Sequence, residues 1–301
     1  MTVLITGATG LIGQELVKLL QANSISVNYL TTSKSKIENN SNYKGFYWNP
    51  KANELDSACF EGVKVIIHLA GASIAKRWTT DYKKEIISSR VDSANVLIQT
   101  LKTTDHTVEH VISSSAIGIY PDSEINYYEE DFTDFDDSFL STVVQKWEDA
   151  VDGFAGLGIP VSKVRTGLVL SGEGGALEQM AKPVKYGLGA PLGSGKQWQS
   201  WIHIQDLVAI YFYILKQKLS GTFNGVAPNP VTNNELTKAI ANQLNRPLIL
   251  PNVPEFMLKL LLGDMYTILV ESQRVSSKKI EDAGFYFEYN SLRPALEHLL
   301  S

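Results

Sequence analysis

Short apolar runs rich in β-branched residues alternate along the chain with longer segments in which apolar residues recur at helical spacing. The short runs predict strands, and they cover residues 3–6, 27–33, 63–71, 110–118 and 159–170. The longer segments predict helices over about residues 11–22, 86–101 and 143–154, with a further helix that begins at Gln205. The run "VKVIIHLAG" at 63–71 is almost continuously apolar, as expected for a parallel strand covered on both faces.

This alternation predicts the fold class. Strands that alternate with helices form right-handed crossovers and pack into a parallel sheet with helices on both faces. We therefore predict an α/β protein with a Rossmann-type, doubly wound parallel sheet. The length of 301 residues exceeds that of such a domain, and five prolines between residues 228 and 254 accompany a shift to helix-rich sequence. The sequence thus predicts a nucleotide-binding domain with substrate-side loops over residues 1–230 and a smaller C-terminal substrate domain over residues 231–301.

The segment "ITGATGLIGQEL" carries the first chemical signal, because its three glycines lie between the first predicted strand and the first predicted helix. A glycine turn at this junction lets backbone N–H groups approach a pyrophosphate at the positive end of the helix dipole. A tight turn without a ligand is the alternative, and the strand before it and the helix after it favour the cofactor site. We expect the turn residues Gly7, Thr9, Gly10, Leu11, Ile12 and Gly13 to contact the cofactor.

The end of the second predicted strand favours one cofactor over another. An NAD site usually places a carboxylate there to bind the ribose hydroxyls, but no Asp or Glu occurs between Val27 and Ile37. Thr32, Ser33 and Lys34 instead offer hydrogen-bond donors and positive charge that suit a 2′-phosphate. We therefore predict NADP(H) rather than NAD(H), the alternative being that the lysines of this loop are simply solvated.

Composition excludes several classes of protein. The net charge of −5 provides no basic surface for a nucleic acid, so we expect no nucleic-acid partner. One cysteine cannot form an internal disulfide, and the five scattered histidines have no zinc-site spacing, so we predict no metal and a reducing, cytoplasmic location. Charged residues interrupt the later apolar run "FMLKLLLGDMYTILV", and the apolar start has no basic region before it; we expect neither export nor membrane association.

Longer blocks of sequence carry a family resemblance. "HLAGASI" at 68–74, "SSSAIGIY" at 113–120 and "GLGAPLGSGKQWQSWIHIQDL" at 187–207 are similar to blocks of the YfcH-type sugar-nucleotide epimerase family, an atypical group of extended short-chain dehydrogenases/reductases sometimes labelled as cell-division inhibitors. The resemblance spans nearly the whole chain, including a characteristic C-terminal region from about residue 248. It implies a Rossmann fold, a dinucleotide cofactor and further cofactor contacts from Leu69, Ala70, Gly71, Ser113 and Arg165.

The resemblance also implies a catalytic set, which is incomplete here. Ser115 matches the serine that hydrogen-bonds the reacting oxygen, and Lys146 matches the lysine that holds the nicotinamide ribose on the next helix. Thr142 stands where the family's usual tyrosine would be, and an aliphatic hydroxyl is too weak an acid to replace a phenol near neutral pH. Tyr120, five residues after Ser115, is the candidate to supply the missing phenol; a packed loop aromatic is the alternative.

The segment at 193–207 gives the predicted substrate side. We expect Gln197, Trp198, Ser200 and Trp201 to contact a small molecule, since they offer stacking faces and polar donors on one loop.

The sequence leaves two classes of function open. The first is an NADP-dependent reductase or epimerase that acts on a sugar-like or other small hydroxyl or carbonyl substrate. The second is a non-catalytic dinucleotide-binding sensor or regulatory protein, which Thr142 would explain directly.

Overall fold

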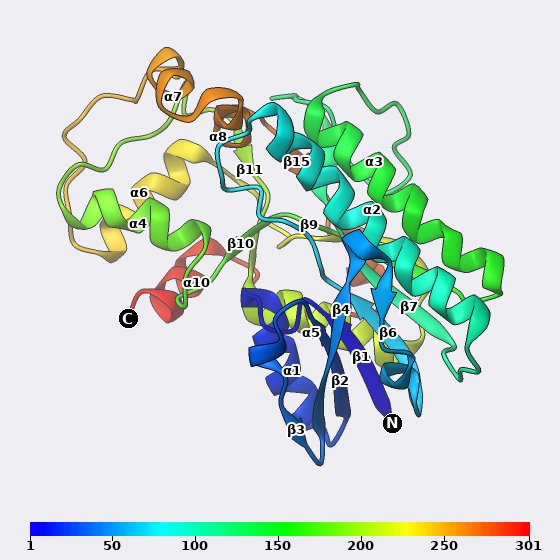
Figure 1. Ribbon diagram of the computed structural model, residues 1–301. Helices are drawn as coiled ribbons and strands as arrows, with labels where there is room; N and C mark the ends of the chain where they lie inside the picture. The colour runs from blue at the N-terminus through cyan, green and yellow to red at the C-terminus, as the bar shows by residue number, and fades with distance from the viewer.

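β1 (Thr2–Thr6) lies inside a nine-stranded sheet in the computed structural model, which describes residues 1–301 (Figure 1). The other strands of this sheet are β2 (Ser26–Thr31), β3 (Asn39–Asn40), β4 (Tyr43–Asn49), β5 (Glu54–Leu55), β6 (Val63–His68), β7 (His110–Ala116), β9 (Val161–Thr166) and β13 (Gly221–Gly225). Their order is β13-β9-β7-β6-β1-β2-β4-β3, with β5 paired to β4 beside that path. All pairs from β13 to β4 are parallel, and the direction of winding reverses between β1 and β6, which confirms the predicted doubly wound fold.

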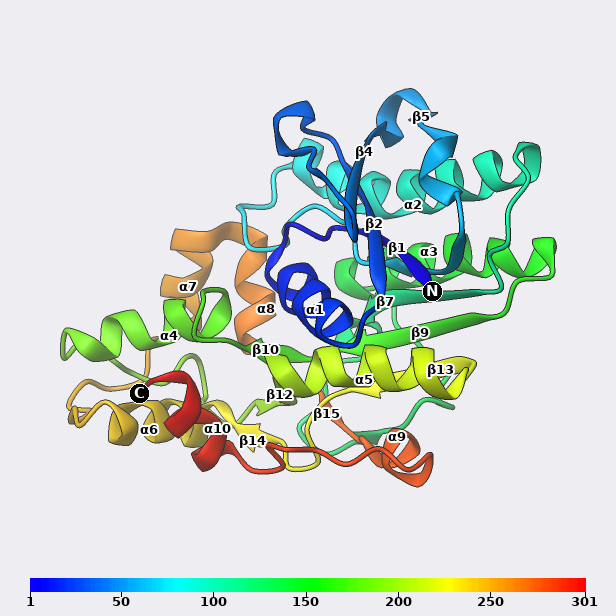
Figure 2. The same cartoon turned by 90° about the horizontal axis from the view of Figure 1, so that it is seen from below.

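Two pairs of helices cover the two faces of the sheet. α1 (Leu11–Ala22) and α5 (Ile204–Gln217) lie on one face, and α2 (Thr80–Thr103) and α3 (Phe139–Asp152) lie on the other (Figures 1 and 2). Side chains alternate along β1, so that Val3 and Ile5 pack with the first pair of helices and Leu4 packs with the second. Burial on both faces explains why the central strands read as apolar runs.

The predicted helix at 11–22 is confirmed as α1, whereas α2 and α3 begin earlier than the apolar spacing predicts. Thr79 and Ser138 explain the difference, because the side-chain oxygen of each accepts a backbone N–H from the first turn of its helix. Side-chain caps thus fix where both helices begin, and apolar spacing alone does not locate such caps.

The apolar run at 159–170 forms two strands rather than one, because the chain leaves the sheet at Gly167. β9 ends at Thr166, and β10 (Leu168–Leu170) pairs in parallel with β12 (Trp201–His203) outside the main sheet. At the break, the Leu168 N–H donates to the Ser200 carbonyl oxygen at 2.8 Å. A Cβ atom at Gly167 would lie 2.1 Å from that same oxygen, so only glycine fits.

A second, smaller core lies beyond this break, around the fully buried Trp201. Its helices are α4 (Ala176–Lys185), α6 (Asn233–Gln243) and α10 (Leu292–Leu299), while β11 (Trp198–Gln199) pairs antiparallel with β14 (Val231–Thr232). Because α4 precedes residue 230, this core draws on both sides of the predicted domain boundary. No helix has both the length and the apolar character needed to cross a membrane.

The chain then returns to the nucleotide-binding half. After α7 (Glu255–Leu262) and α8 (Thr267–Val270), β15 (Arg274–Val275) pairs in parallel with β8 (Tyr127–Tyr128), and α9 (Lys278–Asp282) follows. The Ser272 N–H donates to Asp122 Oδ1 at 2.7 Å, and the Ser272 hydroxyl donates to the Ser123 carbonyl oxygen at 2.9 Å. Residues 271–275 are thereby attached to the loop that follows β7.

The close approach at Gly167 makes a stability prediction. Gly167→Ala should destabilise the protein by about 1–3 kcal/mol, because the new methyl group meets backbone atoms that cannot rotate away. Urea denaturation measures this loss. Gly156→Ala is the matched control, since no atom lies within 4 Å of a Cβ built there, and its free energy of unfolding should be unchanged or slightly higher. Equal stability of both variants would contradict the proposed clash.

Candidate functional site

The turn between β1 and α1 requires glycine at two positions for steric reasons. Gly7 has φ +74°, and a Cβ there would lie 3.1 Å from the Leu69 carbonyl carbon; a Cβ at Gly13 would lie 2.2 Å from the Gly7 oxygen. Gly10 is the N-cap of α1 and makes no side-chain capping bond. The N–H groups of the first turn are therefore available to a ligand, and the exposed Thr9 and Gly10 leave access to them.

The segment after β6 lies directly beside this turn. The N–H groups of Leu69 and Ala70 both donate to Thr6 Oγ1 at 3.0 Å, which fixes residues 69–71 next to the glycines. The structure thus brings together two of the predicted cofactor segments. Ser113 lies deeper in the sheet, fully buried, and its hydroxyl donates to the Ser114 carbonyl oxygen at 2.9 Å.

The loop after β2 carries an unpaired positive charge. Lys34 is exposed, forms no salt bridge, and lies with its Nζ 4.9 Å from the centre of the Tyr47 ring. The Ser33 N–H donates to Thr31 Oγ1 at 3.2 Å, and the Ser33 and Ser35 hydroxyls are 2.9 Å apart. Hydroxyl and ammonium donors therefore occupy the place where NAD-binding folds put a carboxylate.

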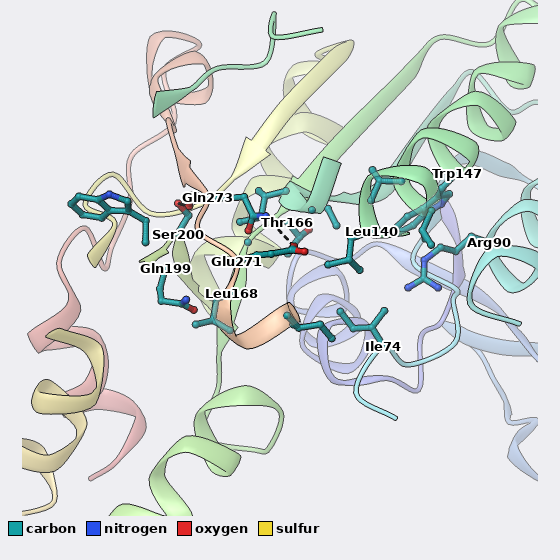
Figure 3. Close-up of a pocket in the computed structure, with 18 residues that line it drawn as sticks. Ile74, Arg90, Leu140, Trp147, Thr166, Leu168, Gln199, Ser200, Glu271 and Gln273 are labelled. Carbon is teal, nitrogen blue, oxygen red and sulfur yellow. Dashed lines mark hydrogen bonds between the residues drawn. The ribbon is translucent and has the colours of Figure 1, made fainter. Parts of the chain in front are cut away.

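A cavity of about 200 Å³ lies where β7 and β9 end, between the sheet and the C-terminal region (Figure 3). Its walls are mostly apolar. They include Ile74, Ile117, Leu140, Val143, Val144, Trp147, Leu168 and Ile268. Trp198 and Ser200 also line the cavity, and their predicted role as substrate contacts stays a prediction. The carboxyl ends of parallel strands share one edge of a sheet, so this cavity and the glycine turn open on the same edge.

Two polar side chains in this cavity wall each contain one buried nitrogen atom that lacks a hydrogen-bond partner. Arg90 Nη1 donates to the carbonyl oxygens of Ile86 and Ala72, but its Nε atom and the Trp147 Nε1 atom are buried without a partner. The Arg90 guanidinium lies 4.9 Å from the Trp147 ring, no carboxylate neutralises it, and burial lowers its pKa to about 10. A ligand with an anionic or carbonyl oxygen would satisfy these donors.

The sequence interpretation missed Arg90, although a signal was present. Ile86, Arg90 and Ala94 follow one another at intervals of four residues, so a single arginine interrupts the apolar stripe of α2. The cavity also contains Glu271, which follows α8 and which no motif indicated. Burial, aided by the carboxylates of Asp122 and Asp136, raises the pKa of Glu271 to about 7.

The predicted catalytic residues Ser115 and Tyr120 belong to one buried hydrogen-bond network, which Glu148 and Arg165 connect, and neither residue lines the cavity. The Ser115 hydroxyl donates to Glu148 Oε1 at 2.6 Å, and Arg165 binds both Glu148 oxygens at 2.9 and 3.0 Å. Arg165 Nη1 donates to the Tyr120 hydroxyl at 3.0 Å, which in turn donates to Asn224 Oδ1 at 2.8 Å. Burial raises the pKa of Tyr120 to about 12, so this phenol is a poor proton donor near neutral pH.

Lys146 lies elsewhere, and the prediction that it faces the cavity is wrong. It is exposed in a shallow groove between α2 and α3, beside Asp92 and Asn95. The face of α3 toward the cavity instead carries Leu140 and Val144 with Val143 and Trp147. Buried Glu148 follows Leu140 and Val144 at intervals of four residues, so the buried face of α3 includes a charged residue as well as apolar ones. Lys146 lies outside this buried face.

Two of the predicted substrate residues are structural. Gln197 is buried, and its Nε2 donates to the carbonyl oxygens of Leu192 and Leu269 at 3.0 and 2.9 Å. Trp201 lies in the second core, where its Nε1 donates to the Asn229 carbonyl oxygen at 2.9 Å. Their own hydrogen bonds occupy these polar groups. The polar groups of Ser200 and Trp198 are also occupied, because the Ser200 hydroxyl donates to the Gln273 carbonyl oxygen at 2.8 Å and Trp198 Nε1 donates to the Glu124 carbonyl oxygen at 2.9 Å, but both residues line the cavity.

The buried Glu148–Arg165 pair makes a stability prediction. Arg165→Met should cost about 3–5 kcal/mol in unfolding free energy, because it leaves a carboxylate in the core without its main counter-charge. The double variant Glu148→Leu, Arg165→Met should recover much of that loss. Chemical denaturation of the single and double variants measures both effects. A double variant no more stable than Arg165→Met alone would show that the charge is not the cause.

The amino-acid sequence matches two protein families and is similar to several epimerase family proteins. Residues 3–138 match the NAD dependent epimerase/dehydratase family, and residues 253–299 match a domain of unknown function, DUF1731. Epimerase family protein SAR0825 of Staphylococcus aureus is 38% identical over 299 residues, which cover 99% of this chain and 98% of the relative. An epimerase family protein of Staphylococcus haemolyticus is 36% identical, with the same coverage. The finer YfcH-type assignment stays a prediction.

Solved structures share the fold. The human epimerase family protein SDR39U1, solved with NADPH, is 29% identical with a TM-score of 0.85, and the match covers 99% of each chain. A nucleoside-diphosphate sugar epimerase from Corynebacterium glutamicum is 30% identical with a TM-score of 0.80; the match covers all of this chain and 58% of that one. UDP-N-acetylglucosamine 4-epimerase from Bacillus cereus, at 18% identity and a TM-score of 0.71, shares the fold alone.

Proposed function

This chain belongs to the epimerase family, and from that premise we propose that it binds NADP(H) and transfers a hydride to or from a small carbonyl or hydroxyl substrate. One observation carries the proposal: the uncapped start of α1 opens on the same sheet edge as a cavity lined by Arg90, whose guanidinium has no carboxylate partner and whose Nε atom makes no hydrogen bond. The first feature suits a pyrophosphate, and the second suits the polar groups of a ligand that continues into the cavity.

The residues fit an NADP-type cofactor along this path. The N–H groups at Leu11 to Gly13 would bind the pyrophosphate, Ser33 and Lys34 would bind the 2′-phosphate, and Arg90 would contact the nicotinamide half. When bound, the nicotinamide supplies or accepts the hydride. The NADPH in the human family member supports this choice of cofactor. The protein contributes binding, orientation and a water-poor, apolar wall.

A second function, dinucleotide binding without chemistry, is favoured by the composition of α3. Its cavity face carries Leu140 and Val144, four residues apart, and neither a tyrosine nor a lysine. Such a protein would report the cofactor level through binding alone. Catalysis would require another residue to move the proton that accompanies hydride transfer.

The loop after β2 gives the first test of cofactor choice. Lys34→Glu should weaken NADPH binding by about 1–3 kcal/mol, roughly 5- to 150-fold, since it replaces the phosphate's counter-charge by a like charge. The affinity for NADH should stay within about twofold, because that cofactor lacks the 2′-phosphate. Fluorescence titration of both nucleotides measures the ratio. Lys44→Glu, on an exposed position of β4, is the control, and a wild type that prefers NADH would remove the NADP assignment.

Arg90 should affect both cofactors equally. Arg90→Met keeps the apolar stem and removes the guanidinium, and we expect NADPH and NADH to bind at least roughly tenfold more weakly. The same titration distinguishes this uniform loss from the selective loss in Lys34→Glu. Lys146→Met is the control, because Lys146 lies outside the cavity, and it should bind NADPH as the wild type does. A normal affinity in Arg90→Met would place the nicotinamide half elsewhere.

A further inference from the structure

Glu271 is the only carboxylate among the residues that line the main cavity. It follows α8, and its N–H donates to the Thr267 carbonyl oxygen at 2.9 Å. Gln273 Nε2 lies 3.4 Å from Glu271 Oε2 and 3.4 Å from the Tyr120 carbonyl oxygen; Figure 3 marks the first of these bonds with a dashed line. Together with the bonds of Ser272 to the loop at 122–123, these contacts hold the carboxylate at the cavity wall.

We propose that Glu271 is the acid–base residue of this site and that the cavity takes a small, largely apolar carbonyl compound. The inference rests on the proposed function, NADP(H)-dependent hydride transfer. In the reducing direction the hydride adds to the carbonyl carbon, the C=O π bond breaks, and the oxygen takes the proton of the Glu271 carboxyl group. The products are an alcohol, NADP⁺ and the Glu271 carboxylate, which regains a proton from water; oxidation of the alcohol reverses each step.

The surroundings of Glu271 suit proton transfer in both directions. Leu140 and Ile268 are apolar neighbours in the wall, and the carboxylates of Asp122 and Asp136 oppose its ionisation. With its pKa raised to about 7, both protonation states are available near neutral pH.

Glu271 also lines a neighbouring cavity, which offers a route for a proton from solvent. The charged groups there are Lys83, Lys259 and Asp264, and Lys83 is paired with Asp264 at 2.6 Å. Within the main cavity the one other charged group is Arg90. Glu271 and Leu140 line both cavities, so the carboxylate lies between a largely apolar cavity and a more polar one.

The composition of the main cavity indicates the substrate class. Its neutral polar side chains include Gln199 and Gln273, and Arg90 is its sole cation. A nucleotide sugar would need counter-charges for a second diphosphate group in addition to that of the cofactor. The volume of about 200 Å³ and the aliphatic walls instead favour an aryl or branched aliphatic ketone or aldehyde.

Binding of acetophenone to the full-length protein tests both parts of the proposal without turnover. Quenching of tryptophan fluorescence reports on the cavity, because Trp147 and Trp198 line it. We expect acetophenone to bind at least fivefold more tightly at pH 5.5 than at pH 8.5, since only the protonated carboxyl group donates a hydrogen bond to the ketone oxygen. In Glu271→Gln, whose amide donates at either pH, the two affinities should agree within twofold.

Glu255→Gln, which changes an exposed carboxylate of α7, should keep the wild-type pH dependence. No binding of acetophenone at either pH would overturn the substrate class, and an unchanged pH ratio in Glu271→Gln would overturn the role of Glu271. NADPH titration of the same proteins separates this outcome from failure of the proposed function: NADPH should bind wild type and Glu271→Gln within twofold, and a wild type that does not bind NADPH would overturn the proposed function itself.

Thermal unfolding gives a second readout of the same carboxyl group and checks that the variant folds. Because the folded-state pKa is raised, ionisation favours the unfolded chain, and the wild type loses stability as pH rises from the unfolded value of about 4.5 through the folded value of about 7. Glu271→Gln lacks this loss. Its Tm should exceed that of the wild type by roughly 2–6 °C at pH 8.5, and the difference should shrink toward pH 5. A constant difference across this range would show that Glu271 titrates normally, which would overturn its role.

Discussion

The ion pair between Glu148 and Arg165 sets how α3 lies on the sheet, and the cavity depends on that position. Glu148 is buried and bound by two guanidinium nitrogens of Arg165, which lies on β9, the strand next to the edge strand β13. Val144 and Leu140 precede it by one and two turns, so they lie on the same side of the helix and extend over the ends of β7 and β9. A charged anchor inside the core thus fixes an apolar wall at the strand ends.

That anchor also limits which chemistry α3 can provide. A helix whose sheet-facing row is occupied by Leu140, Val144 and Glu148 presents no phenol or ammonium group to the cavity, and the nearby polar residues Ser115 and Tyr120 are used to satisfy the ion pair. Under the proposed function, an acid must therefore come from another part of the chain. The C-terminal region supplies the carboxylate of Glu271, which lines the cavity and whose pKa is raised to about 7 by its surroundings.

The sequence predicts the parts of this arrangement that depend on neighbouring residues better than the parts that depend on contacts between residues far apart in the chain. Alternation of apolar runs indicated the doubly wound sheet, and the glycine spacing indicated the turn before α1, because both are local patterns. The orientation of α3 was mispredicted because Glu148 reads as a surface residue until its partner Arg165, on a strand 17 residues later, is known. Trp198 and Ser200 line the cavity, and their role as substrate contacts stays a prediction. Glu271 reaches the cavity through long-range contacts, such as the bond between Ser272 and Asp122, 150 positions earlier in the chain, which periodicity does not detect.

Because β15 pairs with β8, a strand about 150 residues earlier, one wall of the cavity can form only late in translation. The glycine turn and the strands on either side of it are complete once the first 225 residues have emerged, since β13 is the last strand of the sheet. The wall formed by residues 268–273 joins them only after about fifty further residues have been translated. A ribosome-bound chain stalled before residue 268 would therefore have its nucleotide-binding edge open to solvent and no enclosed chamber beside it. Long-range contacts of this kind form slowly, so the cavity is expected to form after the nucleotide-binding edge.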